Sequence, residues 1–204
     1  MGLYQERVVP ALVALAMGGR QFRPFRRRVV GGASGRVLEV GVGAGDNLGF
    51  YPEATGELFA LDPSARLLAR ARRRVPSGRQ VRFLEAGAEA IPLDDASMDT
   101  VVMTWTACSI PEPAAALAEI RRVLKPAGRL LFVEHGRSHD AAVARWQDRL
   151  DPLWSRVAGG CHLNRRIDLA LPEAGFRLDG LTTGYGLAGP KVLTFLYEGA
   201  ASPR

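Results

Sequence analysis

Three glycines stand at alternate positions, Gly41, Gly43 and Gly45, in the stretch VLEVGVGAGDNLGFY. A glycine-rich turn between a strand and a helix lets a ligand lie against bare backbone and points helix amides toward it. The spacing here is G-x-G-x-G, whereas dinucleotide-binding turns read G-x-G-x-x-G. Taken alone, the pattern indicates either a ligand-binding turn or simply a tight turn.

Two carboxylates flank this turn in the sequence. Asp62 ends the next predicted strand, about twenty residues after Gly41, where an acidic side chain can accept hydrogen bonds from both ribose hydroxyls of a ligand. Asp62 can also cap the helix that follows Pro63, and the two roles are compatible. Glu39 lies in an apolar strand, where a carboxylate is costly to bury unless it is paired.

The elements that position these residues alternate along the chain. Apolar runs predict strands at 36–40, 57–61, 80–85, 99–104 and 129–134, with two late candidates at 176–181 and 192–197. Helical patterns occupy 3–30 (broken near Pro10, Gly18-Gly19 and Pro24), a segment from Asp46-Asn47, 63–75, 112–124 and 146–157. Such alternation predicts an α/β fold whose parallel sheet is covered on both faces and binds ligands at the carboxyl ends of its strands.

Charge and cysteine content limit the function classes. The 204 residues carry a net charge of +6, which suits nucleic acid or an anionic membrane. The arginine clusters lack the interleaved aromatic residues that single-stranded nucleic acid needs, so we expect no nucleic-acid partner. Cys108 and Cys161 are too few for a disulfide framework and lack metal-site spacing, so we expect no metal.

The apolar run Val8–Met17 is short of the roughly 20 residues that span a bilayer. We therefore expect a cytoplasmic protein, either free or peripheral at the inner membrane surface.

Four stretches carry a family resemblance: LEVGVGAG, LDPS, AGAEAIPLDDASMDTVV and IRRVLKPAGRLLFVEHG. In this order and spacing they resemble the successive motifs of class I S-adenosylmethionine-dependent methyltransferases. The resemblance covers residues 36–136. It implies a Rossmann-like seven-stranded, mostly parallel sheet with helices on both faces and the last strand antiparallel. It also implies S-adenosyl-L-methionine as cofactor and S-adenosyl-L-homocysteine as product.

The resemblance assigns cofactor-binding roles to particular residues. It places Gly41, Gly43 and Gly45 under the methionine part of the cofactor, and Asp62 at the ribose. The loop Gly87-Ala88-Glu89 would frame the adenine. Many relatives have Asp at the position of Gly87, so either Glu89 or the Ala88 amide would take over its role. Glu39 would fix the turn or bind the cofactor's ammonium, and the remaining candidate cofactor residues are Asn47, Pro63 and Thr104.

The C-terminal third bears on the methyl acceptor. FVEHGRS, RWQDRLDPLWSRVAGGCHLNRRI and LPEAGF resemble the branch of membrane-associated alkyl-thiol methyltransferases and their bacterial relatives, near quinone and phospholipid methyltransferases. His135 follows the fifth strand and is the candidate catalytic base or acceptor-orienting group; the alternative is a histidine bonded to loop backbone. Tyr4, Trp105 and His162 are candidate substrate-binding residues. Cys161 is not expected to act as a nucleophile, because methyl transfer is direct.

These observations predict residues 1–30 as an N-terminal helical lid or interfacial segment, or a helix packed on the sheet, and 31–204 as the methyltransferase domain. The predicted function is methyl transfer from S-adenosylmethionine to a small lipophilic acceptor such as a thiol. Two alternatives remain: methyl transfer to a phospholipid amine or a quinone at an anionic membrane surface, and a cofactor-binding protein without turnover. No obligate protein partner is evident.

Overall fold

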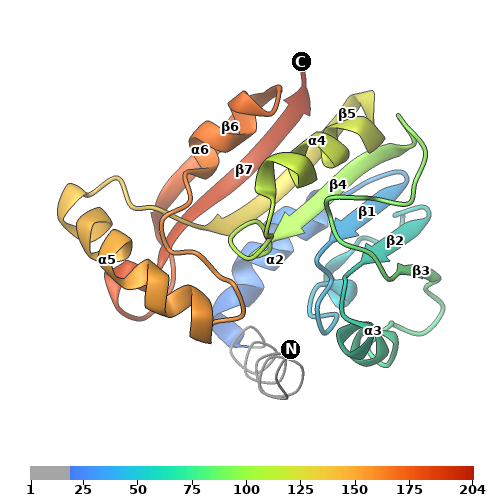
Figure 1. Ribbon diagram of the computed structural model, residues 1–204. Coiled ribbons are helices and arrows are strands. Elements are labelled where there is room, and N and C mark those ends of the chain that lie inside the picture. The colour runs from blue at the N-terminus through green and yellow to red at the C-terminus, as the bar shows by residue number, and fades with distance from the viewer. Residues whose placement is uncertain (1–18) are drawn as a thin grey trace.

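The computed structural model describes residues 19–204, which form a seven-stranded sheet with helices packed against both faces (Figure 1). The strands are β1 (Val37–Val40), β2 (Leu58–Leu61), β3 (Val81–Leu84), β4 (Met98–Thr104), β5 (Leu124–His135), β6 (Phe176–Tyr185) and β7 (Phe195–Pro203). The α-helices are α2 (Arg23–Val29), α3 (Ala65–Arg72), α4 (Pro113–Val123), α5 (Ala141–Val157) and α6 (Ile167–Glu173). Short 3₁₀ turns are η2 (Arg20–Phe22), η3 (Val30–Gly32), η4 (Leu48–Phe50) and η5 (Lys191–Leu193).

The strand order is β3-β2-β1-β4-β5-β7-β6, with β1 to β5 parallel and β7 antiparallel to both of its neighbours. The predicted fold class is thereby confirmed. The chain moves outward from β1 to β3 and then returns to β4 on the other side of β1. The carboxyl ends of β1 and β4 therefore flank the point where the strand order reverses, which is the usual ligand site of such sheets.

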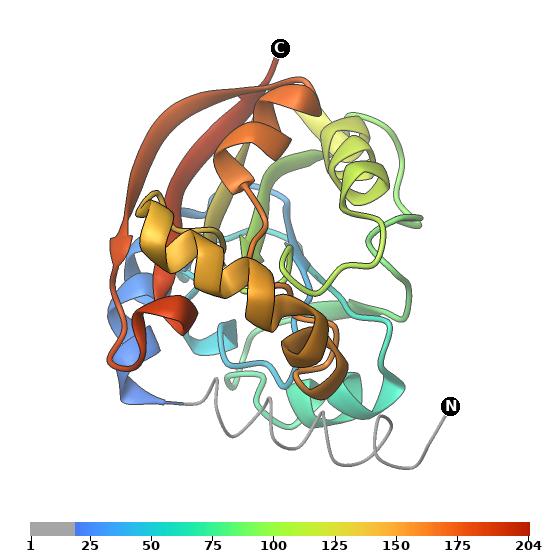
Figure 2. The same cartoon turned by 60° about the vertical axis from the view of Figure 1, so that its left-hand side comes forward.

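Two apolar clusters pack against opposite faces of the sheet. One includes Ile120 of α4 and Leu171 of α6, and the other includes Val30 of η3 and Leu68 of α3. All four residues of β1, like those of β2, are buried, as expected for strands covered on both sides. In the turned view of Figure 2, α5 lies in front of the sheet, on the same side as α4 and α6. It lies at the end to which the arrows of β4 and β5 point in Figure 1.

Three local predictions were wrong. The glycine turn leads into the single 3₁₀ turn η4, not into a helix, because Pro52 holds Tyr51 in an extended conformation (φ −64°, ψ 136°). Pro24 lies in the first turn of α2, where proline is tolerated, and does not break a helix. The last strand begins only at Phe195, because Lys191–Leu193 forms η5.

The N-terminal predictions lie partly outside the described residues. Tyr4, Pro10 and the run Val8–Met17 belong to that part. In residues 19–30, η2 and α2 pack on the domain, and Val29 and Val30 are buried in its core. Within residues 19–204, no helix is both long enough and apolar enough to cross a bilayer.

Candidate functional site

A cavity of about 370 Å³ opens at the carboxyl ends of β1 and β2, between the glycine turn and the loop after β4. We refer to it as the cleft. It brings together predicted residues from distant parts of the chain: Gly41, Gly43, Asp62, Pro63, Gly87, Ala88, Glu89 and Trp105. An adjoining cavity of about 90 Å³ shares Gly41, Gly43 and Trp105 with it and adds Asn47 and Thr104. A larger cavity of about 830 Å³, between Glu53–Leu58 and Pro76–Arg82, contains none of the predicted site residues.

The three turn glycines have different surroundings. All have positive φ, +73° at Gly41, +55° at Gly43 and +85° at Gly45, a conformation that side chains disfavour. A Cβ at Gly41 would overlap the Thr106 side chain, and one at Gly45 would lie 2.9 Å from the Ala71 Cα. A Cβ at Gly43 would meet nothing within 4 Å. Gly41 and Gly45 thus allow the turn to pack, whereas Gly43 exposes backbone to the cleft.

Asp62 holds this turn and borders the cleft. Its Oδ2 accepts a hydrogen bond from the Gly43 amide at 2.9 Å, and its Oδ1 accepts one from the Ser64 amide at 2.9 Å. Burial raises the pKa of Asp62, while the two amides act in the opposite direction. Each carboxylate oxygen can accept more than one hydrogen bond, so the side chain can also accept from ligand hydroxyls.

We expect Asp62→Ala to weaken S-adenosylhomocysteine binding by roughly tenfold to a hundredfold, because a charge-assisted acceptor is worth about 1.5 to 3 kcal/mol. Titration calorimetry measures this change. Ser64→Ala is the matched control, since it removes the Ser64 Oγ that accepts from Leu67 N at the start of α3 but leaves the carboxylate. Unaltered affinity in Asp62→Ala would exclude Asp62 from the site.

Glu39 is buried behind the turn with its carboxylate fully engaged. Its Oε1 accepts from Asn47 Nδ2 and its Oε2 from the Tyr51 hydroxyl, both at 2.9 Å. Asn47 Nδ2 also donates to Thr104 Oγ1, which ties the turn to the end of β4. Burial raises the pKa of Glu39 to about 7. Because Glu39 lines neither the cleft nor the adjoining cavity, its observed contacts are those of a turn-fixing residue.

Arg26 was not among the predicted site residues. It is buried, its Nε donates to Asn47 Oδ1 at 3.0 Å, and its guanidinium carbon lies 5.4 Å from the centre of the Trp105 ring. Burial lowers the pKa of Arg26, and the nearby carboxylates Asp46 and Glu39 oppose this. Arg26 stands in a run of three arginines at 26–28, so its sequence context did not distinguish it from solvent-exposed arginines. Its spacing of four residues from Phe22 could have indicated that both side chains lie on the same helix face.

Trp105 forms the wall opposite the turn. Its backbone has φ +49°, which is unusual for a residue with a side chain, and its amide donates to Val133 O at 2.8 Å. Its ring contacts Phe22 edge-on at 5.0 Å and Phe25 at 6.2 Å. Among the described residues, its buried Nε1 has no hydrogen-bond partner. The strained backbone thus holds an aromatic wall beside the cleft.

The loop after β3 places Glu89 close to Gly87. A Cβ at Gly87 would lie 2.7 Å from Glu89 Oε2, so the Glu89 carboxylate occupies space that a side chain at position 87 would need. Glu89 Oε1 also accepts from the Glu112 amide at 3.4 Å. Gly87, Ala88 and Glu89 all line the cleft, and the replacement of an aspartate at position 87 by Glu89 stays a prediction.

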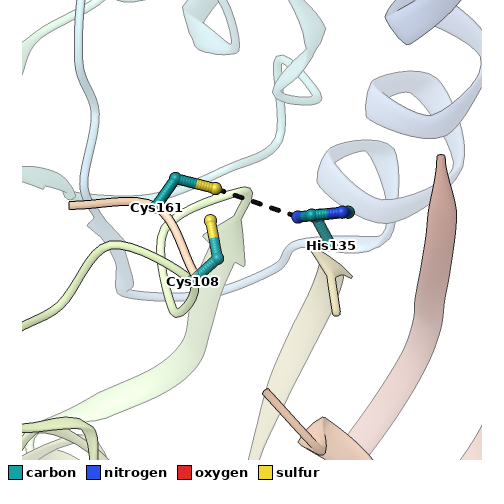
Figure 3. Close-up of side chains that lie close together, drawn as sticks. All are labelled: Cys108, His135 and Cys161. Atoms are coloured by element: carbon teal, nitrogen blue, oxygen red, sulfur yellow. Dashed lines mark hydrogen bonds between the residues drawn. The ribbon is translucent and has the colours of Figure 1, made fainter. Parts of the chain in front are cut away.

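Neither candidate histidine is among the residues that line the cleft. His135 ends β5 and is buried, and its Nδ1 faces Cys161 Sγ at 3.8 Å with Cys108 beside them (Figure 3). His162 is paired with Asp151, Nδ1 to Oδ2 at 2.8 Å, which turns it toward α5. The sequence did not indicate the Cys108–His135–Cys161 cluster, because its members come from three separate segments.

The two thiols of this cluster influence each other. The hydrogen bond from Cys108 lowers the pKa of Cys161. The same hydrogen bond, together with burial, raises the pKa of Cys108 well above its usual range.

Comparison with known proteins agrees with this geometry. Residues 38–132 match the family described as a methyltransferase domain. The human thiol S-methyltransferase TMT1B is 37% identical over 152 residues, which are 71% of this chain and 62% of that protein. The demethylmenaquinone methyltransferase of Renibacterium salmoninarum is 39% identical over 124 residues, 59% of this chain and 50% of that protein. The chain thus spans less than two thirds of the length of these relatives.

Solved structures support the fold. An S-adenosylmethionine-dependent methyltransferase from Thermotoga maritima, described as a possible histamine N-methyltransferase, superposes with a TM-score of 0.70 at 22% identity. The alignment covers 98% of this chain and 97% of that one. A methyltransferase from Aquifex aeolicus gives a TM-score of 0.69 at 20% identity, covering 96% and 98%.

Proposed function

The chain belongs to the class I S-adenosylmethionine-dependent methyltransferases, and we propose that it transfers the cofactor's methyl group to a small lipophilic thiol. One observation supports methyl transfer most directly. The backbone at Gly43, which has open space in front of it, and the buried carboxylate of Asp62 lie together in one cleft. A turn that served packing alone would not need the open space at Gly43.

The residues of the cleft fit the cofactor. Gly43 would lie under its methionine part, Asp62 would accept from its ribose hydroxyls, and the loop of Ala88 and Glu89 would border its adenine. Asn47 and Thr104 in the adjoining cavity would face its amino-acid end, with Glu39 fixing Asn47 from behind. When bound, S-adenosylmethionine supplies an activated methyl group on a sulfonium.

The protein's own contribution to the reaction is geometry and exclusion of water. Trp105, fixed by Phe22 and Arg26, would form a rigid wall that aligns the acceptor with the methyl group. Alignment of reacting atoms in a dry site can supply most of the rate for an already activated donor. A thiol acceptor suits such a site because only its thiolate is needed, and an ordinary thiol has a pKa near 8.5.

The relatives support a thiol but leave alternatives. Thiol S-methyltransferases from human, mouse and rat are 34–38% identical to this chain, and quinone methyltransferases from bacteria are 32–39% identical. A quinone or a phospholipid amine is therefore the second candidate acceptor class. A protein that binds the cofactor without turnover is the third alternative.

An exposed apolar stripe on α5 supports a lipophilic acceptor delivered from a membrane surface. Trp146, Leu150, Leu153 and Val157 recur at helical spacing and are 38–65% exposed. The arginines Arg145, Arg149 and Arg156 are exposed beside this stripe. The helix ends at Val157, and the next two residues, Ala158 and Gly159, line the cleft. An apolar face flanked by cations is the pattern of a helix that lies in an anionic membrane interface.

An acceptor screen with labelled cofactor tests the proposal. We expect methyl transfer to alkyl thiols, rising with pH as the thiolate forms, and little transfer to quinols or to phosphatidylethanolamine vesicles. Transfer to quinols or vesicles alone would replace the thiol by the second acceptor class. Cofactor binding without transfer to any acceptor would favour the third alternative.

Sedimentation with anionic vesicles at low and high salt tests the membrane association separately. We expect the protein to pellet at low salt and to be released at high salt. A protein that stays in the supernatant at low salt would contradict peripheral membrane binding. Deleting residues 1–18 then tests whether these residues contribute to vesicle binding. A deletion that extends to residue 30 would also remove Val29 and Val30, which are buried in the core.

A further inference from the structure

Three side chains of the kind that bind soft metal ions converge beside the cleft. Cys108 lies in the loop after β4, His135 ends β5, and Cys161 lies in the loop after α5 (Figure 3). One potential ligand atom of each lies within 4.8 Å of the other two, and Cys161 Sγ is 3.8 Å from His135 Nδ1. The two side chains Cys108 and His135 are buried, and Cys161 is half-buried.

These separations fit a common tetrahedral ion. With zinc–sulfur bonds of about 2.3 Å and zinc–nitrogen bonds of about 2.0–2.1 Å, a shared ion would hold sulfur and nitrogen about 3.6 Å apart and two sulfurs about 3.8 Å apart. The measured 3.8 Å between Cys161 Sγ and His135 Nδ1 is close to that value. Cys108 lies within 4.8 Å of both, so binding would require its sulfur to move inward by at most about 1 Å.

We propose that Cys108, His135 and Cys161 form a three-ligand site for a soft divalent cation, with zinc as the expected ion. Thiolate and imidazole ligands favour zinc over magnesium or calcium, which prefer oxygen. The neighbouring Glu134 carboxylate is fully buried, and its Oε2 has no hydrogen-bond partner within the described residues.

Three protein ligands leave the fourth tetrahedral position open, as in zinc sites that take part in catalysis. The cluster is bounded by residues of the cleft wall: Cys108 Sγ lies 3.8 Å from Trp105 O, and the Cys161 amide donates to Ala158 O at 3.2 Å. Trp105 and Ala158 both line the cleft. The ion would thus lie behind the part of the cleft wall that Trp105 and Ala158 form, where the proposed function places the methyl acceptor.

A role in the reaction rests on the proposed thiol methyl transfer. A thiol that takes the open position loses its proton to solvent and binds as a thiolate at neutral pH. Its sulfur then attacks the methyl carbon of the cofactor, the bond from that carbon to the sulfonium sulfur breaks, and a thioether and S-adenosylhomocysteine are formed.

Cobalt titration of the reduced full-length protein tests the site. We expect one Co²⁺ per chain, with the thiolate-to-metal charge-transfer and intense visible bands of a tetrahedral site, and displacement of these bands by Zn²⁺. Cys108→Ser, Cys161→Ser and His135→Ala should each weaken Co²⁺ binding at least about a hundredfold, since loss of a group that only orients a ligand already costs tenfold to a hundredfold.

His139→Gln is the matched control, because His139 pairs with Asp168 outside the cluster and should leave Co²⁺ binding unchanged. S-adenosylhomocysteine binding by each variant checks that the domain is folded. The proposal is overturned if the folded, reduced protein binds no Co²⁺, or if the cluster variants bind it as the unchanged protein does.

Removing the metal separates this inference from the proposed function. We expect the metal-free protein to keep cofactor binding but to lose thiol methylation, which added zinc restores. Thiol methylation that persists without metal overturns the catalytic role of the ion. Cobalt binding at the cluster without thiol methylation in any form overturns the thiol as acceptor and leaves the metal site standing.

Discussion

Gly43→Val is expected to weaken S-adenosylhomocysteine binding at least a hundredfold while the protein remains folded. A Cβ at this position meets no protein atom within 4 Å, and Gly43 lines the cleft, so we expect the valine side chain to occupy space that the cofactor would take. A hundredfold loss corresponds to about 2.7 kcal/mol. The positive φ of +55° adds a stability cost of about 1–2 kcal/mol.

Gly45→Ala separates ligand binding from folding in the same turn. Its Cβ would lie 2.9 Å from the Ala71 backbone, and its φ is +85°, so we expect lower thermal stability. Calorimetric titration should therefore show the larger loss of affinity in Gly43→Val, and thermal unfolding the larger loss of stability in Gly45→Ala. If the Gly43→Val variant binds S-adenosylhomocysteine normally, the cofactor does not lie at this turn and the proposed cofactor site is wrong.

Most of the residues predicted for the cofactor half of the site line one cleft, because their placement follows directly from topology. The turn after β1 and the acidic end of β2 lie on adjacent parallel strands, so Gly43 and Asp62 must meet at one edge of the sheet. The local patterns of β1 and β2 are clear because β2 is apolar throughout and β1 is apolar apart from Glu39. The same argument places the loop of Ala88 after β3.

The acceptor half could not be predicted in the same way. Cys108 and His135 lie at the ends of the adjacent strands β4 and β5, but the placement of Cys161 against them depends on how α5 packs, and no spacing in the sequence encodes it. His162 was a reasonable candidate from its position next to Cys161, but the carboxylate of Asp151 holds it. Arg26 was hidden among arginines that face solvent.

We expect the free energy of unfolding to fall as the pH rises from about 4.5 to about 7, because Glu39 has a raised pKa in the folded protein. Burial raises the pKa of Glu39 from 4.5 to about 7, against the opposing effects of Tyr51, Asn47 and Arg26. The folded protein therefore keeps a proton that the unfolded chain releases across this window. The contribution of Glu39 to stability is fully present below pH 4.5 and is lost as the pH rises through about 7, the pKa of Glu39 in the folded protein.

The size of this effect follows from linkage. A shift from 4.5 to about 7 corresponds to about 3 kcal/mol, since each pKa unit is worth 1.36 kcal/mol. Glu39→Gln stays neutral at every pH, and its amide can donate to Tyr51 as a protonated carboxyl would. We therefore expect the variant to lose most of the decline between pH 4.5 and 7. Denaturant unfolding of both proteins measures the difference.

Subtracting the two curves isolates Glu39 from other titrating groups. Asp62 also has a raised pKa from burial, so it contributes to the decline in the same direction, but it does so equally in both proteins. Parallel curves for the two proteins would mean that Glu39 is ionised in the folded state throughout. In that case the Arg26 guanidinium, acting through Asn47, would have to outweigh the cost of burying the carboxylate. The Glu39–Asn47–Arg26 network would then be a buried ion pair bridged by an amide, and Arg26→Gln would be strongly destabilising because it would leave that charge uncompensated.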